Sequence, residues 1–208
     1  MNEFALAPAG ERQSAFIETA ASMGVSPLII EKDFWVCWCL GRLFEMPDLP
    51  GHIFKGGTSL SKVYGLIHRF SEDIDISLNR AEMGFGKDND PAAEDLSGKK
   101  RQKLRNELAG ACATYIETEM LPRFQKACQS ILGENGWSVF MDERDPDRQR
   151  SCFNIRQVLP NIRPAPISSQ MFCSNSVAEE ISGRPGKQSC TPLWRSNFRR
   201  SSDIRRSK

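Results

Sequence analysis

The chain has 208 residues, a net charge of +2, 39% hydrophobic and 26% charged residues. These values are ordinary for a soluble globular protein with one sizeable domain. No stretch approaches the roughly 20 apolar residues that span a bilayer, and the N-terminus lacks the basic and apolar regions of a signal peptide. The seven cysteines include no CxxC pair. We therefore expect a cytoplasmic protein without a disulfide framework and without a membrane segment.

The charge is distributed unevenly along the chain. Residues 151–208 contain ten basic and three acidic residues, a net charge of +7, whereas residues 1–150 contain 18 basic and 23 acidic residues, a net charge of −5. We predict an enzyme-like domain over residues 1–150 and a basic tail over residues 151–208.

In chain order, apolar spacing predicts a short helix over residues 11–23 that ends at Gly24. Ser26 and Pro27 are typical of a helix start, and the helix that follows, to about Glu45, is apolar on nearly all sides, which indicates burial. A strand should end at residues 53–54, and a helix should follow over residues 58–66.

The alternation of Ile74, Ile76 and Leu78 with polar residues predicts a half-buried strand. Residues 84–98 read as a loop. Residues 99–132 are helical in pattern, with a break or kink expected at Pro122. A further strand is predicted over residues 137–141.

Asp73 and Asp75 are the first candidates for chemistry. On a strand, residues i and i+2 point to the same face, so their carboxylates would converge on one ion. Two hard oxygen ligands suit Mg²⁺, which completes its shell with waters and substrate phosphates. The pair alone is a weak signal, because the same spacing occurs on many solvated strand ends.

A glycine pair lies upstream, between a predicted strand and a predicted helix. Gly56 and Gly57 would let backbone N–H groups approach a phosphate, and Thr58 can cap the helix whose N-terminus attracts an anion. Because Gly57 stands where a P-loop needs lysine, we reject a P-loop. A phosphate cradle beside a metal site is the equipment for phosphoryl-type transfer.

Three blocks of sequence resemble one family. The run from Phe54 to Lys62 (FKGGTSLSK), the run from Arg69 to Asp75 (RFSEDID) and the upstream run from Glu31 to Val36 (EKDFWV) are similar to the AbiEii/AbiGii toxins among the polymerase-beta-like nucleotidyltransferases. The resemblance covers about residues 11–150. It implies an α/β fold of the minimal nucleotidyltransferase type, a small mixed sheet flanked by helices.

The resemblance also implies a function. It indicates a nucleotidyltransferase toxin of a bacterial toxin–antitoxin or abortive-infection system, dependent on Mg²⁺ (or Mn²⁺). Such an enzyme would transfer a nucleotide from an NTP to an acceptor such as tRNA, and a cognate antitoxin would be its partner.

Site roles follow residue by residue from the resemblance. Asp73 and Asp75 become the metal-binding catalytic carboxylates, and Lys62 is added as a catalytic residue. The nucleotide-binding set comprises Lys55, Gly56, Gly57, Thr58 and Arg69.

Other polar residues favour ordinary readings. Cys37 and Cys39 lie on the buried helix at a spacing that points to different faces, which favours core packing. His52 and His68 lack partners at ligand spacing. The basic run 99–105 could contact RNA phosphates, but a solvated helix start is the simpler interpretation.

The irregular tail leaves two interpretations open. Residues 151–208 contain eleven Ser and five Pro without sustained periodicity, whereas the family continues with strands, one of which is expected to supply a third carboxylate. The tail could be a basic arm for nucleic acid or a partner. The loss of pattern favours an out-of-frame, disordered segment, in which case the chain would be an inactive remnant that at most binds nucleotide or antitoxin.

Overall fold

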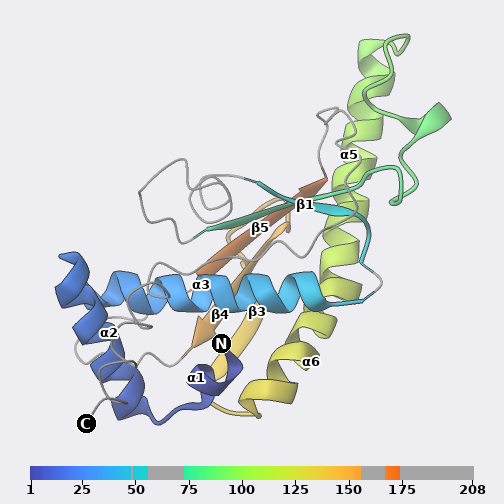
Figure 1. Ribbon diagram of the computed structural model, residues 1–208. Helices are drawn as coiled ribbons and strands as arrows, with labels where there is room; N and C mark the ends of the chain where they lie inside the picture. The colour runs from blue at the N-terminus through green and yellow to red at the C-terminus, as the bar shows by residue number, and fades with distance from the viewer. Residues whose placement is uncertain (48, 56–72, 156–166, 174–208) are drawn as a thin grey trace.

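A mixed five-stranded sheet forms the centre of the molecule (Figure 1). The computed structural model describes residues 1–47, 49–55, 73–155 and 167–173, the last of these as backbone only. The strands are β1 (His52–Lys55), β2 (Ile74–Leu78), β3 (Trp137–Met141), β4 (Arg150–Ile155) and β5 (Ile167–Cys173), in the order β1-β2-β5-β4-β3. β2 and β5 are parallel, and every other neighbouring pair is antiparallel.

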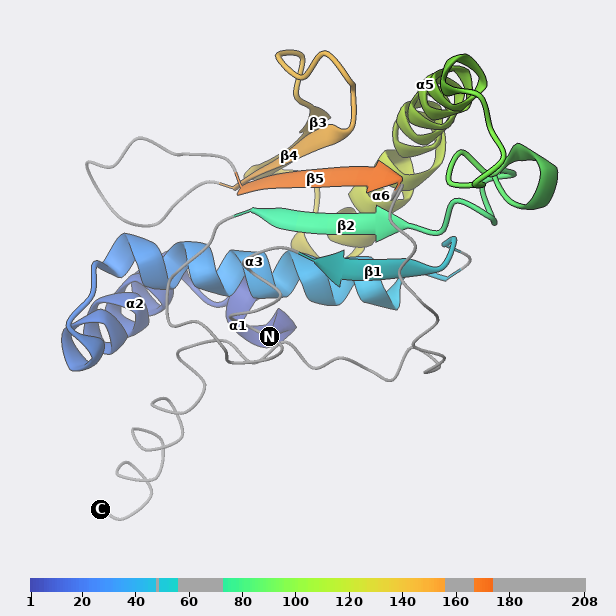
Figure 2. The same cartoon turned by 90° about the horizontal axis from the view of Figure 1, so that it is seen from above.

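Helices flank this sheet. They are α1 (Asn2–Leu6), α2 (Ala9–Met23), α3 (Pro27–Glu45), α5 (Gly98–Tyr115) and α6 (Leu121–Leu132), with a short 3-10 turn at Lys87–Asn89. α3 runs along one face of the sheet, as the two perpendicular views show (Figures 1 and 2). The predicted fold class, a small mixed sheet flanked by helices, is confirmed.

The core lies between α3 and the sheet. Phe153 on β4 is the meeting point of several rings, with ring centroids 6.2 Å from Trp35, 6.0 Å from Trp38 and 6.3 Å from Phe124 on α6. All four side chains are at most 6% exposed. Burial of such aromatic side chains is the largest favourable contribution to the stability of a domain of this size.

The residue pattern explains which face of the sheet is buried. Ile74, Ile76 and Leu78 alternate along β2 and are all buried. Phe54 stands opposite Ile76 and packs against Phe44 of α3, with ring centroids 6.4 Å apart. These side chains therefore point toward α3, and the intervening residues of β1 and β2 point to the opposite face.

The ends of the first long helices agree with the sequence prediction. Gly24 ends α2 in a left-handed conformation with φ of 66°, which glycine adopts without steric cost, and its N–H donates to the Ala20 carbonyl. Pro27 occupies the first turn of α3, where no helical donor is needed. Ser26 stands at the N-cap position, but its side chain accepts no capping hydrogen bond.

The predicted break near Pro122 is a short π-helical segment. Ile116–Met120 forms this segment between α5 and α6, and Pro122 falls in the first turn of α6. The segment lies just before Pro122, which has no N–H to donate to a carbonyl one turn earlier. The predicted long helical region is therefore continuous from α5 through α6, with the irregularity placed just before the proline.

The structure also contains elements that the sequence pattern does not predict. α1 precedes the first predicted helix, and Asn2 there accepts a hydrogen bond of 3.0 Å from the Trp38 indole. β4 and β5 lie within residues 150–173, where the sequence analysis expects an irregular tail. Both are inner strands, so their pairing comes from neighbours on both sides rather than from alternation in their own sequence.

Two predicted features lie outside the described residues. These are the helix over residues 58–66 and the segment from residue 174 to the end of the expected tail. Within the part of the chain that the structure describes, no helix is both long enough and apolar enough to cross a membrane.

Candidate active site

Asp73 and Asp75 lie at the beginning of β2. Asp73 directly precedes the strand and is exposed, whereas Asp75 is its second residue and is partly buried. Because Ile74 and Ile76 point toward α3, Asp75 points to the opposite face of the sheet, and the i, i+2 spacing directs Asp73 to the same side. This arrangement agrees with the expected convergence of the two carboxylates, although only Asp75 belongs to the strand itself.

The electrostatics of Asp75 reflect this crowding. Burial raises the pKa of the Asp75 carboxyl, the neighbouring Asp73 carboxylate raises it further, and the positive charge of Arg150 opposes both effects. A nearby cation stabilises the ionised form of such a crowded carboxyl. The pair therefore fits a divalent ion such as Mg²⁺, which commonly uses one or two protein carboxylates.

Lys55 shares the face of the sheet that carries Asp75. It is the last residue of β1 and stands directly opposite Asp75 in the antiparallel register. Side chains of directly opposite residues point to the same face, with Cβ atoms about 5 Å apart. The predicted nucleotide-binding Lys55 therefore lies next to the acid pair.

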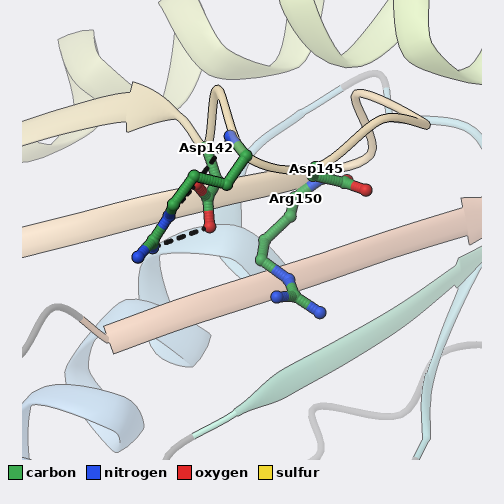
Figure 3. A network of polar contacts seen from close by, with 4 residues as sticks. Asp142, Asp145 and Arg150 are labelled. Atoms are coloured by element: carbon green, nitrogen blue, oxygen red, sulfur yellow. Dashed lines mark hydrogen bonds and ion pairs between the residues drawn. The ribbon is translucent and has the colours of Figure 1, made fainter.

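Arg150 completes a row of residues across the sheet. Residue 170 of β5 pairs with Asp75 of β2 on one side and with Arg150 of β4 on the other. We call Lys55, Asp75, position 170 and Arg150 the cross-strand row. Figure 3 shows the Arg150 side chain leaving β4 and extending over β5 toward β2.

Two aspartates build the loop that leads into Arg150. Asp145 accepts 2.8 Å hydrogen bonds from the backbone N–H groups of Gln149 and Arg150. The backbone N–H of Asp142 donates to the Arg150 carbonyl at 2.8 Å. The Asp142 carboxylate holds the Arg144 guanidinium through two contacts of 2.8 and 3.0 Å (Figure 3).

Asp142 does not join the acid pair. It adjoins Arg150 at the end of β3, so three strand spacings, about 14 Å, separate it from Asp75. The Arg144 side chain also engages its carboxylate, which lowers the pKa of Asp142. Among the described residues, no group of three or more His, Cys, Asp and Glu side chains is arranged to hold a metal ion.

Several predicted site residues are outside the described ranges, and Arg150 of the cross-strand row was not predicted. The first set comprises Gly56, Gly57, Thr58, Lys62 and Arg69. Arg150 was missed because it falls at the boundary that the charge distribution set between domain and tail. The weak alternation of residues 150–155 was its only sequence signal.

The acidic residues of the upstream sequence block, Glu31 to Val36, lie in the interior of the protein. Glu31 and Asp33 are buried on α3, at 1% and 0% exposure. Arg12 of α2 lies over the Trp35 ring at 5.6 Å, and the Glu31 charge acts to raise its pKa against the larger lowering by burial. The charged residues Glu31 and Asp33 therefore belong to the interior of the protein, and the Glu31 charge acts on Arg12 of the neighbouring helix.

The remaining predicted features follow ordinary packing. Cys37 and Cys39 are both buried on α3, which confirms the core interpretation. In the basic run 99–105, Arg101 donates to the carbonyl oxygens of residues 93 and 94, and Lys103 lies 3.7 Å from Glu107.

The small mixed sheet flanked by helices, with Asp73 and Asp75 at the beginning of an inner strand, agrees with the fold that the resemblance predicts. The profile of the family described as "Nucleotidyl transferase AbiEii toxin, Type IV TA system" matches residues 38–171. The chain belongs to this family. The matched region begins within α3 and ends within β5, so it includes nearly the whole sheet and continues past residue 150.

One solved structure is similar to the chain. It is MenT4, a nucleotidyltransferase toxin from Mycobacterium tuberculosis H37Rv, at 15% sequence identity and a TM-score of 0.36. The similarity covers 76% of this chain but 43% of MenT4, so the chain spans less than half the length of that protein. No curated protein sequence matches the chain.

Proposed function

We propose that this chain is a nucleotidyltransferase toxin that transfers a nucleotide from an NTP to an acceptor. Membership of the AbiEii family supports the class of reaction. The observation that carries the proposal is the position of Asp73 and Asp75 on one face of the sheet, with Lys55 directly opposite Asp75. Negative ligands for a metal and positive charge for a phosphate lie side by side.

Asp73 and Asp75 would hold Mg²⁺ (or Mn²⁺). When bound, that ion neutralises phosphate charge and orients the phosphate chain for in-line displacement. Lys55 contributes a second positive charge at the edge of the acid pair. Gly56, Gly57 and Thr58 follow Lys55 directly in the chain, so the proposed phosphate-binding loop begins where β1 ends. Lys62 and Arg69 remain proposed as catalytic and nucleotide-binding residues.

The acceptor and the partner are parts of the same proposal. An RNA end such as that of tRNA supplies the hydroxyl that attacks the α-phosphate, with pyrophosphate as the leaving group. A cognate antitoxin, encoded with the toxin, would limit this activity in the cytoplasm. Family membership supports the antitoxin at the level of a toxin–antitoxin system, and the RNA acceptor is our proposal.

Label transfer tests the proposed function. The purified chain is incubated with each α-labelled NTP, Mg²⁺ and total tRNA, and label is followed into RNA. We expect transfer from at least one NTP, and its loss in Asp75→Asn, which keeps the size of the side chain but removes its charge. Absence of transfer from all four NTPs would favour an inactive remnant that at most binds nucleotide or antitoxin.

A further inference from the structure

We propose that Arg150 is a phosphate-binding residue of this site, contacting the triphosphate of the nucleotide from the side opposite Lys55. The choice of ligand rests on the proposed function, but the anion-binding role of Arg150 does not require that transfer occurs. The observations that carry it are the position of Arg150 in the cross-strand row, the direction of its side chain and the construction of its loop.

The first observation is position. Arg150 and Asp75 both pair with residue 170, so two strand spacings, about 10 Å, separate their backbones. An arginine side chain spans most of that distance. The guanidinium extends over β5 toward β2, the strand that carries Asp75 (Figure 3).

The second observation is how the loop fixes Arg150. Its N–H donates to the Asp145 carboxylate and its carbonyl accepts from the Asp142 N–H, each at 2.8 Å. Both backbone polar groups of this one residue are thereby fixed at the start of β4. A backbone that is already fixed adds no main-chain ordering cost when the side chain binds a ligand.

The third observation is that the side chain of Arg150 takes a different direction from the other arginines of this loop. Arg144 forms its ion pair with Asp142, and Arg148 forms one of 2.6 Å with Glu117. Both are well exposed, with 82% and 60% of the side chain accessible. Arg150 differs from both because it extends inward over the sheet, toward the acid pair.

Chemistry favours a phosphate chain as the ligand. Guanidinium groups bind phosphate oxygens through paired N–H···O contacts, which an ammonium cannot reproduce. Lys55 and Arg150 lie on either side of Asp75 in the cross-strand row. A polyphosphate on this face would therefore have a cation at each side and the metal-binding acids between them.

Binding of inorganic tripolyphosphate in the presence of Mg²⁺, measured by calorimetry, tests the inference on the full chain. Arg150→Ala should weaken binding at least tenfold. Arg150→Lys, which keeps the charge but loses the paired contacts, should lie between Arg150→Ala and wild type. Arg144→Ala is the matched control, because it removes an equal charge from the same loop, and we expect its affinity to stay within about twofold of wild type.

Each other outcome is decisive. Equal affinity of Arg150→Ala and wild type, equal losses in Arg144→Ala and Arg150→Ala, or no binding by wild type would overturn the inference. If Arg150→Ala does not fold by circular dichroism, folded Arg150→Lys with wild-type affinity would overturn it. Selective loss in Arg150→Ala without label transfer by wild type would remove the proposed function and leave the inference standing. Transfer by wild type with unchanged Arg150→Ala affinity would support the proposed function and overturn the inference.

Discussion

Lys55 and Asp75 stand directly opposite each other in the antiparallel register of β1 and β2. The pairing brings opposite charges together at one end of the β1–β2 pair, on the face turned away from α3. β1 is described up to Lys55, and Gly56 and Gly57 follow it directly in the sequence. The proposed metal ligands and the proposed phosphate-binding loop are thus connected by one pair of strand residues.

The acid pair should bind a divalent ion. Replacing Asp73 and Asp75 together by Asn removes both charges with little change in volume, so Mn²⁺ affinity measured by calorimetry should fall at least tenfold. Asp88→Asn, an exposed residue of the loop after β2, is the control and should bind like wild type. Equal Mn²⁺ binding by the double variant and wild type would remove the metal site.

The glycine loop should bind phosphate through its backbone. A valine side chain at Gly57 would occupy the space that a phosphate needs beside the N–H groups. We expect Gly57→Val to lose NTP binding, measured by fluorescence titration, while circular dichroism stays unchanged. Gly98→Val is the control, because open space surrounds a side chain added at Gly98. Unchanged NTP affinity in Gly57→Val would show that the loop is only a turn.

Phe153 should be indispensable to the core. It lies 4% exposed among the rings of Trp35, Trp38 and Phe124, so Phe153→Ala leaves a large cavity and should cost about 3–5 kcal/mol of unfolding free energy. Phe140→Ala on β3 is the control, because Phe140 is 43% exposed and should cost about 1 kcal/mol or less. Urea denaturation measures both, and similar small losses would argue against β4 as a core strand.

Truncation tests whether the domain ends near residue 150 or near residue 173. A chain that ends after residue 173 keeps all five strands, whereas a chain that ends after residue 149 lacks β4 and the central β5. We expect the first to unfold cooperatively and the second to aggregate or remain unfolded, since its apolar surface lacks a partner. Thermal unfolding followed by circular dichroism measures the cooperativity of both chains. A cooperatively folded 1–149 chain would support the predicted boundary near residue 150.

The ion pair of Arg80 and Asp90 should contribute to stability at neutral pH. Its atoms lie 2.9 Å apart, and the hydrogen bond from Arg80 lowers the pKa of Asp90. A lowered folded-state pKa stabilises the protein above the unfolded value of about 3.9, and this stabilisation is lost as the pH falls through the folded-state value. Asp90→Asn should therefore cost about 1 kcal/mol or less at pH 7, with a smaller difference near pH 3.

A matched variant controls for simple loss of charge. Glu107→Gln removes one carboxylate from an exposed pair on α5, with Lys103 at 3.7 Å. Its unfolding free energy should stay near that of wild type at both pH values, because exposed pairs contribute little. A larger effect at Glu107 than at Asp90 would contradict the assignment.

Strong periodicity explains what the sequence could predict. The helix around Leu108 and the strand with Ile74 and Ile76 carry clear periods of 3.6 and 2, and the helix around Phe34 carries a start signal and a long apolar run. All three were found. The acid pair was predictable from its spacing on such a strand. These features depend on neighbours within a few residues, which a single sequence displays.

The rest of the sheet was not predictable for a physical reason. β5 contains Ser168, Ser169 and Gln170, a composition that gives no strand signal by itself. Its pairing with β2 and β4 is a long-range property, decided by neighbours about 95 and 15 residues away in sequence. Arg150 was not predicted for the same reason, because only the pairing through position 170 brings it into the same cross-strand row as Asp75.

The central place of β5 also governs when the site can form. Its parallel pairing with β2 joins segments about 95 residues apart in sequence, and contacts of such high sequence separation form slowly. During synthesis, Asp73 and Asp75 leave the ribosome roughly 95 residues before the strand that completes their sheet, a delay of about 5–20 s at usual elongation rates. A nascent chain that stops earlier carries the acids without an assembled site, so ribosome-bound fragments of this toxin family member should be inert.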